Sequence, residues 1–133
     1  MISSAEEFKR YVESNNEDER IKAHESAPEE IWIEILRKYP DLSRQVAFNS
    51  TIPLAILELL SQSDNVEVRW DIAMKKRINR PIFERLSNDT SPSVRHRIAC
   101  NSKTPQELLV KLSLDEDKMV SEAAKKRMKQ PDN

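Results

Sequence analysis

The side chains that could carry chemistry in this sequence occur in pairs, without the further residues that a catalytic or metal site needs. His96 and Cys100 are four residues apart, so on a helix they would lie on the same side, and both residue types bind zinc. Two ligands do not make a zinc site, because further protein ligands are required. No Ser-His-Asp or Cys-His arrangement stands out by its spacing. We therefore expect no metal, no cofactor and no enzymatic activity.

The charged clusters have plain structural interpretations. Asp115-Glu116-Asp117 lacks the glycine and the spacing of a calcium loop, which favours a capped acidic turn. Two basic runs, residues 74–80 (MKKRINR) and 125–129 (KKRMK), end expected helices, where cations favour the helix dipole. The alternative is a phosphate-binding edge, for which the candidate residues are Lys75, Lys76, Arg77, Arg69 and Arg95.

Composition excludes whole classes of protein. The chain has 133 residues, no glycine and a formal net charge of −1. Without glycine, neither the phosphate-binding loops of nucleotide enzymes nor tight Asn-Gly hairpins can form. The single cysteine excludes an internal disulfide, and the N-terminal MISSAEEFKR has no apolar signal core. With 38% hydrophobic and 34% charged residues, we expect a cytoplasmic helical protein that does not enter a membrane.

An internal repeat predicts the fold. Five alanines recur about every 24 to 26 residues, namely Ala23, Ala47, Ala73, Ala99 and Ala124. Four of them follow an apolar residue five positions earlier, namely Leu42, Val68, Val94 and Met119. A second apolar set with the i, i+1, i+4 spacing of a helix face follows each of the first four alanines. Its members are Ile31/Trp32/Ile35, Ile56/Leu57/Leu60, Ile82/Phe83/Leu86 and Leu108/Leu109/Leu112.

Capping residues separate these apolar sets. We call the helix that contains each recurring alanine the first helix of its unit, and the helix with the following apolar set the second helix. Ser26 with Glu29, and Thr104 with Glu107, have the spacing of capping boxes before the second helices. Before the first helices we expect caps from Asp41, Asp64 or Asn65, Ser91 and Asp117. Four asparagines near helix ends, Asn49, Asn65, Asn88 and Asn101, are expected to replace glycine in left-handed caps. Pro81 comes two positions later than Pro53 and Pro105 do in their units, which predicts that its helix starts late or is distorted.

These signals predict an all-α right-handed α-solenoid of about four to five helix-turn-helix repeats of about 25 residues, with roughly ten helices. Helix pairs this short are marginal alone, so each must stack on its neighbours. We expect one domain, residues 1–128. It comprises a cap, 1–16, with a helix near 4–13 that turns Phe8, Tyr11 and Val12 inward, then repeats 17–41, 42–65, 66–92 and 93–116, a helix at 117–128 and a disordered tail at 129–133.

One stretch, residues 88–115, resembles the variant leucine-rich repeat, a relative of HEAT repeats. The matching positions are Asp89, Val94, Arg95, Ala99, Asn101, Thr104, Pro105, Leu108, Leu109 and Leu112. Residues 64–73 and 44–60 match in part and the first unit weakly, so the resemblance covers most of 18–124. It implies a right-handed superhelix of two helical layers. Founding members carry a cysteine-ligated iron–sulfur module, which cannot be built here because Cys100 is the single cysteine.

A helical wheel of the first helices identifies a candidate contact surface. Two rows point away from the expected core, namely Arg20, Arg44, Trp70, His96, Ser121 and His24, Phe48, Met74, Cys100, Lys125. Their i, i+4 neighbours form a ladder of candidate partner-binding residues, Arg44/Phe48, Trp70/Met74 and His96/Cys100. Interface cores are enriched in such residues. The alternative is that the ladder is core, because tryptophan and phenylalanine are usually buried.

We therefore predict a monomeric, non-enzymatic scaffold that binds a protein partner of unknown identity. Arg69 and Arg95 most simply link adjacent loops through aspartates. The first alternative is a nucleic-acid-binding module that uses the arginines and residues 75–77. The second is an enzyme similar to the HEAT-like DNA glycosylases, with Arg69, Trp70 and Asp71 at the lesion. Its short length and near-neutral charge disfavour that reading.

Overall fold

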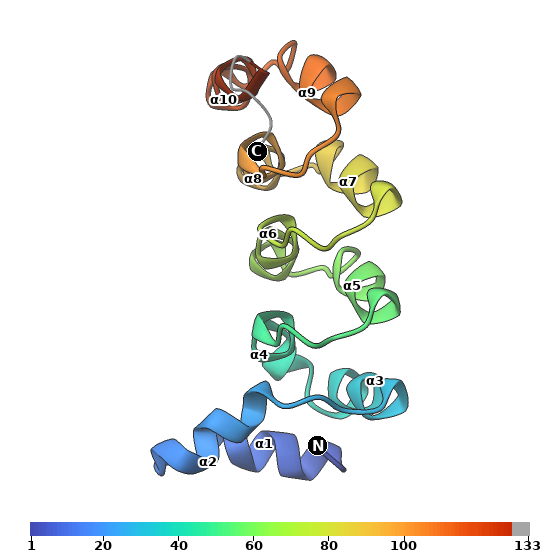
Figure 1. Ribbon diagram of the computed structural model, residues 1–133, viewed down its shortest axis with the longest axis vertical. Helices are drawn as coiled ribbons and strands as arrows, with labels where there is room; N and C mark the ends of the chain where they lie inside the picture. Colours follow the sequence, from blue (N-terminus) through green and yellow to red (C-terminus); the bar gives the residue numbers. More distant parts are fainter. Residues whose placement is uncertain (129–133) are drawn as a thin grey trace. The chain divides into compact units, whose positions relative to one another are not determined.

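The computed structural model describes residues 1–128, and in this range it holds ten α-helices and no strand, which confirms the all-α class. The predicted tail, 129–133, and Lys129 of the second basic run lie outside the described residues. The helices are α1 (Ala5–Glu13), α2 (Glu17–Ile21), α3 (Glu29–Lys38), α4 (Ser43–Phe48), α5 (Leu54–Leu60), α6 (Val66–Ala73), α7 (Arg80–Ser87), α8 (Pro92–Cys100), α9 (Gln106–Leu112) and α10 (Lys118–Met128) (Figure 1). Short 3-10 helices, η1 (Lys22–His24) and η2 (Pro40–Leu42), follow α2 and precede α4.

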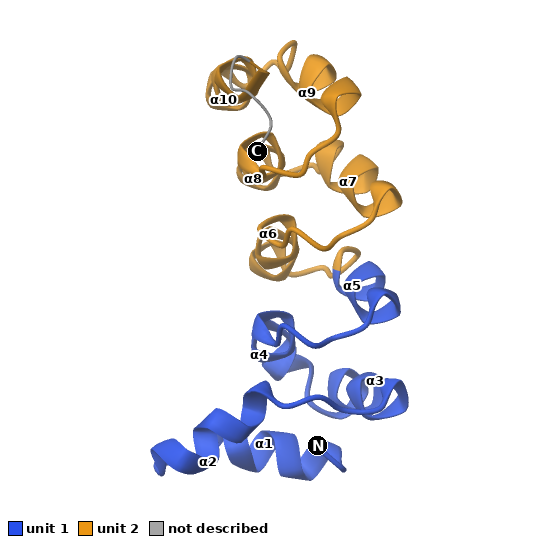
Figure 2. Cartoon of the chain, viewed as in Figure 1, with its two compact units in different colours: residues 1–60 blue, residues 61–133 orange. Residues whose placement is uncertain are grey.

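The chain divides into two compact units, residues 1–60 (unit 1) and residues from 61 onward (unit 2) (Figure 2). In unit 1, α1 packs on α3, and the ring of Phe8 meets Trp32 edge-on with 5.5 Å between centroids. Both side chains are fully buried, and Tyr11 is also buried, whereas Val12 is only half-buried. Ser4 caps α1 by accepting a hydrogen bond from the Glu7 amide at 3.0 Å, as expected of a serine N-cap.

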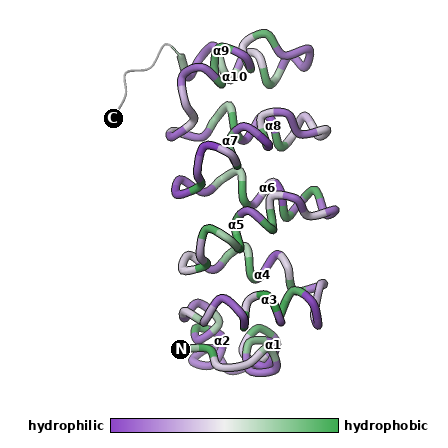
Figure 3. The backbone as a smooth tube through the Cα atoms, turned by 90° about the vertical axis from the view of Figure 1, so that its right-hand side faces the viewer, coloured by the Kyte–Doolittle hydropathy of each residue, from purple (hydrophilic) through white to green (hydrophobic). Residues whose placement is uncertain are grey.

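In unit 2, the first helices α6, α8 and α10 form one layer, and α7 and α9 form the other (Figure 1). The core between the layers is built from the predicted apolar sets, whose members are buried: Val68, Ile72, Ala73, Val94, Ile98 and Ala99 from the first helices, and Ile82, Phe83, Leu86, Leu108, Leu109 and Leu112 from the second. In unit 2, hydrophobic and hydrophilic residues are mixed along each helix (Figure 3), because one stripe of the helix faces this core.

The predicted register of the last helix is wrong by one residue. Met119, which the spacing from Ala124 places in the apolar stripe, is 66% exposed, whereas Val120 is fully buried. Val68, Val94 and Val120 are equivalent, because they follow one another at intervals of 26 residues. The position of the recurring alanine is therefore taken by Lys125 in this helix, and Ala124 corresponds to Ile98.

The predicted capping boxes of the second helices do not form. Pro28 and Pro105 themselves occupy the N-cap positions of α3 and α9, so no side chain caps either helix. The hydroxyl of Thr104 instead donates a hydrogen bond to the Ile98 carbonyl at 2.6 Å. Thr104 therefore closes the end of the preceding helix, α8, and Ser26 and Glu29 do not pair as a box.

Of the caps predicted for the first helices, two are confirmed. The side chains of Asn65 and Asp117 accept hydrogen bonds from the amides of Glu67 at 2.9 Å and Val120 at 3.1 Å. Ser91 is the N-cap residue of α8 but makes no side-chain cap bond. The Asp41 prediction is wrong, because η2 contains this residue and α4 begins after Leu42.

Two further predictions about helix ends are wrong. The helix that contains Pro81, α7, begins at Arg80, seven residues after Ala73, just as α5 and α9 begin seven residues after their alanines. It begins at the regular position because Asn79 caps it, accepting a hydrogen bond from the Ile82 amide at 3.2 Å, and because the first turn tolerates proline. The asparagines are not left-handed caps either, because no residue in the described range has a positive φ.

Candidate functional site

Buried asparagines position the residues of the predicted ladder. In unit 2, the side-chain amide of Asn101 donates to the carbonyls of Ala73 and Lys75, each at 2.9 Å. These carbonyls flank Met74, and Asn101 directly follows Cys100. The asparagine therefore fixes the end of α8 against the end of α6.

Unit 1 repeats this arrangement. The Asn49 side chain donates to the carbonyls of Ala23 and Glu25, each at 2.9 Å, and these two residues flank His24. Phe48 directly precedes Asn49 at the end of α4. Within each unit, the asparagine thus connects the backbone beside two consecutive members of the second row, which stand at the ends of different helices. These members are His24 and Phe48 in unit 1, and Met74 and Cys100 in unit 2.

The ladder residues lie at the surface and not in the core. Phe48 is 55% exposed, Met74 is 45% exposed, and Cys100 is also exposed. Arg44, Trp70 and His96 are half-buried. Phe48 at the end of α4 in unit 1, and Met74 directly after α6 in unit 2, are therefore large apolar side chains that stand in solvent.

Arginines cover the faces of two ladder aromatics. In unit 1, the Arg44 guanidinium lies 5.4 Å from the centroid of Phe48, one turn along α4. In unit 2, Arg97 of α8 lies 5.1 Å from the centroid of Trp70 of α6. Cation–π contacts of this kind hold the ring and the cation together at a surface. Arg97 is not a member of either predicted row, although its place one residue after His96 on α8 puts it beside the first row.

Unit 2 has a pocket of about 420 Å³ and another of about 320 Å³, and two ladder residues line the smaller one. It lies between α8 and α10 and is lined by His96, Cys100, Ala123, Lys126 and Arg127. The Cys100 sulfur is 3.7 Å from His96 Nε2, which confirms that the two side chains face the same side of α8. The Arg127 guanidinium is held by donating from Nη2 to the Ser102 carbonyl at 2.7 Å.

Sequence reasoning missed the contribution of α10 because it used the wrong register. It placed Ser121 and Lys125 in the rows, but Ser121 is buried. The interval of 26 residues from Trp70 and His96 leads to Glu122, and the interval from Met74 and Cys100 leads to Lys126. Aligning the valines instead of the alanines would have found Lys126. We call the surface of Trp70, Met74, His96, Arg97, Cys100, Lys126 and Arg127 the α6–α8–α10 face.

Arg69 and Arg95 link loops through aspartates, which is the structural role predicted for them. Arg69 pairs with Asp89 through two hydrogen bonds of 2.8 and 3.2 Å, and Arg95 pairs with Asp115 through bonds of 2.9 and 3.3 Å. Each arginine also donates to a backbone carbonyl at 2.7 Å, Arg69 to Ser63 and Arg95 to Asp89. The pairs are largely buried, so they link the loops of successive helix pairs within unit 2.

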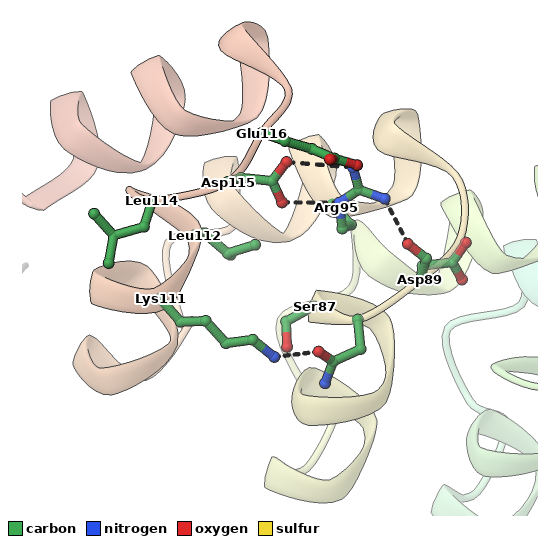
Figure 4. A pocket seen from close by; sticks show the side chains of 9 residues that line it. Ser87, Asp89, Arg95, Lys111, Leu112, Leu114, Asp115 and Glu116 are labelled. Atoms are coloured by element: carbon green, nitrogen blue, oxygen red, sulfur yellow. Dashed lines mark hydrogen bonds and ion pairs between the residues drawn. The ribbon is translucent and has the colours of Figure 1, made fainter.

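Because these ion pairs engage Arg69 and Arg95, the two arginines are poorly placed to bind a phosphate. The larger pocket, beside Arg95, is lined by the carboxylates of Asp89, Asp115 and Glu116, which repel an anion (Figure 4). In the same pocket, Lys111 donates to the Asn88 side chain (Figure 4).

In the basic run after α6, one of the three candidate cations is partly withdrawn from solvent. Lys75 is half-buried, and its pKa is lowered, first by burial and then by the charge of Arg77, with Asp71 acting in the opposite direction. Lys76 and Arg77 are exposed. The glycosylase alternative is also disfavoured, because Asp71 is only 5% exposed and does not present its carboxylate at the surface.

Among residues 1–128, no three side chains of histidine, cysteine, aspartate or glutamate are placed to hold a metal ion. In the same range, no helix has the length and apolar character needed to cross a bilayer.

Comparison with known proteins identifies no relative: no family model, no curated protein and no solved structure matches the chain. The resemblance to variant leucine-rich repeats therefore stays a prediction from residues 88–115.

Proposed function

We propose that this protein is a non-enzymatic binding module that recognises a protein partner with the exposed side chains of its first helices. The observation that carries the proposal is the exposure of Phe48 and Met74, each at the end of a helix whose preceding residue is buried. Large apolar side chains held in this way are the usual anchors of protein interfaces. In unit 2, Trp70 with Arg97, and Met74, supply the residue types that dominate such contacts.

We also propose that the helix pairs are repeats of a right-handed α-solenoid, as the resemblance implies. The spacing supports this arrangement, because the buried residues Leu42, Val68, Val94 and Val120 follow one another at intervals of 26 residues. Solenoid repeats present equivalent side chains in rows, and such rows form extended binding surfaces.

Nucleic-acid binding is the weaker candidate. It would rest on Arg69 and Arg95, whose guanidinium groups are engaged by Asp89 and Asp115, and on residues 75–77, of which Lys76 and Arg77 are exposed. A net charge of −1 gives no general attraction to a polyanion. If this candidate were correct, binding would weaken steeply as salt rises.

The test is affinity capture from extract of the native cell, with and without nuclease, using matched variants. Met74→Asp charges the α6–α8–α10 face, and Val110→Asp places the same charge on α9 at a residue with nearly equal exposure, 46% against 45%. For unit 1, Phe48→Asp is matched by Leu59→Asp on α5.

The proposal expects a protein that survives nuclease treatment, is retained by the two control variants and is lost with Met74→Asp or Phe48→Asp. Loss of the captured protein upon nuclease treatment would favour the nucleic-acid candidate. Equal capture by all four variants would contradict the proposed contact residues.

A further inference from the structure

We propose that the pocket between α8 and α10 takes the carboxylate of an acidic segment of the partner protein. This inference rests on the proposed function and names the chemistry that the α6–α8–α10 face would recognise.

The pocket is lined by basic groups. His96, Lys126 and Arg127 contribute nitrogen donors, and Cys100 and Ala123 complete the lining. No carboxylate is among its lining residues in the described chain. The two charged groups of the lining, Lys126 and Arg127, are both cations, and clustered charge of one sign attracts a ligand of the opposite sign, so an anionic group fits here best.

One donor of this pocket is held in place by a hydrogen bond to the backbone. Arg127 is anchored by its bond to the Ser102 carbonyl, which fixes the guanidinium beside α8. His96 is half-buried on the same helix, and its Nε2 lies 3.7 Å from the Cys100 sulfur. Lys126 is exposed on α10, so its ammonium can move to meet a ligand. The anchored guanidinium of Arg127 loses little freedom when a carboxylate binds.

The charge of the face differs from the charge of the whole chain. The chain carries a formal net charge of −1, whereas the α6–α8–α10 face carries Arg97, Lys126 and Arg127. Arg69 and Arg95 on the same helices are neutralised by Asp89 and Asp115. Glu122 on α10 and the buried Asp71 on α6 are the acidic residues nearest to these rows in the sequence register, so the cations outnumber them.

The surroundings favour a peptide over a nucleic acid. Trp70 and Met74 on α6 lie next to α8 in the same helix layer, and Arg97 joins the two helices through its contact with Trp70. An apolar side chain of the partner can rest on Trp70 and Met74 while a neighbouring carboxylate enters the pocket. A nucleic-acid backbone instead needs a stripe of cations along its length.

The test uses the full chain and two short fluorescent peptides, one that alternates glutamate with leucine and a twin in which every glutamate is replaced by glutamine. Binding is measured by fluorescence anisotropy, and the site is mapped by amide chemical shifts. Lys126→Glu reverses a charge in the pocket. Lys125→Glu is the matched control, because it makes the same change one residue away, outside the pocket lining.

The proposal expects the glutamate peptide to bind about tenfold or more tightly than its glutamine twin, and Lys126→Glu to weaken it by a similar factor. Lys125→Glu should change the affinity by about twofold or less. The largest shift changes should fall on His96, Cys100, Lys126 and Arg127. Equal binding of the two peptides, or no binding of the glutamate peptide up to about 1 mM, would overturn the proposal.

Two further outcomes separate this inference from the proposed function. If a single-stranded DNA oligonucleotide binds more tightly than the glutamate peptide and loses affinity in Lys126→Glu, the pocket recognises phosphate and the peptide proposal fails. If the peptide does not bind but Met74→Asp still abolishes capture of a protein partner, the inference fails and the proposed function stands.

Discussion

Asn101 holds the backbone on both sides of Met74. Its side-chain amide donates to the carbonyls of Ala73 and Lys75, and Asn101 itself is buried. The side-chain oxygen of Asn101 accepts a bond from the Lys103 amide at 2.9 Å, so the residue is satisfied on both sides. Through this one residue, the position of an exposed methionine on α6 is fixed relative to Cys100 on α8.

Removing this amide should destabilise unit 2. Asn101→Ala leaves the carbonyls of Ala73 and Lys75 and the amide of Lys103 without their partner, at a cost of about 2–3 kcal/mol. Urea unfolding followed by circular dichroism measures the loss. The control is Asn15→Ala, because Asn15 is exposed and its change should stay within about 0.5 kcal/mol. Equal effects from the two variants would contradict the role assigned to Asn101.

The ion pair between Arg95 and Asp115 should make the stability of unit 2 depend on acid pH. Burial alone would raise the pKa of Asp115, but hydrogen bonds from Arg95 and the Asp117 amide outweigh it and lower this pKa below its usual value. Because the folded-state pKa is the lower one, the stabilisation is complete above about pH 4 and is lost as pH falls through the folded-state pKa.

Asp115→Asn should therefore reduce the free energy of unfolding at pH 7 by about 2–4 kcal/mol and flatten its decline below about pH 4. Thermal unfolding across a pH series measures both effects. Glu116→Gln is the neighbouring control, because Glu116 is exposed and acts on Arg95 through its charge, without the two hydrogen bonds that Asp115 accepts from Arg95. If the wild type and Asp115→Asn decline in parallel on acidification, the pair does not contribute as described.

Substitution of an exposed residue and of a buried residue at the end of α6 should change the stability by very different amounts. Met74→Asp changes a side chain that already stands in solvent, so the stability should change by about 0.5 kcal/mol or less. Ile72→Ala, two residues earlier, opens a cavity in the core and should cost about 2–5 kcal/mol. Chemical denaturation of the two variants side by side measures the contrast. A large loss in Met74→Asp would place this residue in the core and remove it from the contact surface.

Cys100 should react in the native protein, because its sulfur is exposed beside a basic pocket. Two disulfide reagents, one dianionic and one neutral, separate access from charge. Lys126→Glu should slow the anionic reagent about threefold relative to the neutral one, since it reverses one nearby charge. Stopped-flow absorbance gives both rates. A common slowing of both reagents would mean that access had changed, and no slowing would mean that Lys126 does not act on the pocket.

The sequence predicted the helices well because their signal is repeated. The buried side chains Val68, Val94, Ile98 and the leucines of α9 are spaced as a helix stripe, and burial of that stripe is what forms the core. The same periodicity pointed Phe48 and Met74 away from the core but left open whether neighbouring helices bury them, and in the structure both are exposed. Proline positions were less informative, because α7 starts at its regular place through the Asn79 cap although Pro81 is displaced.

What the sequence could not supply are contacts across helix pairs. Nothing local indicates that Asn101 bonds to carbonyls 26 and 28 residues earlier, or that the partner of Arg69 is Asp89 instead of the nearer Asp64. The α10 side of the pocket was missed for a different reason. The equivalent of Ala99 in this helix is Lys125, and alignment on the neighbouring Ala124 shifts every row by one residue.

The central claim is that a protein partner docks on the α6–α8–α10 face, and cross-linking from Cys100 tests it most directly. Because Cys100 is the single cysteine, a photoreactive maleimide can be attached there in the native chain. The control is the double variant Cys100→Ser/Val110→Cys, which carries the same group on α9. After irradiation in native cell extract, we expect one nuclease-resistant protein adduct from Cys100 that the control does not give. Identical adducts from both positions, or adducts with nucleic acid alone, would contradict the claim.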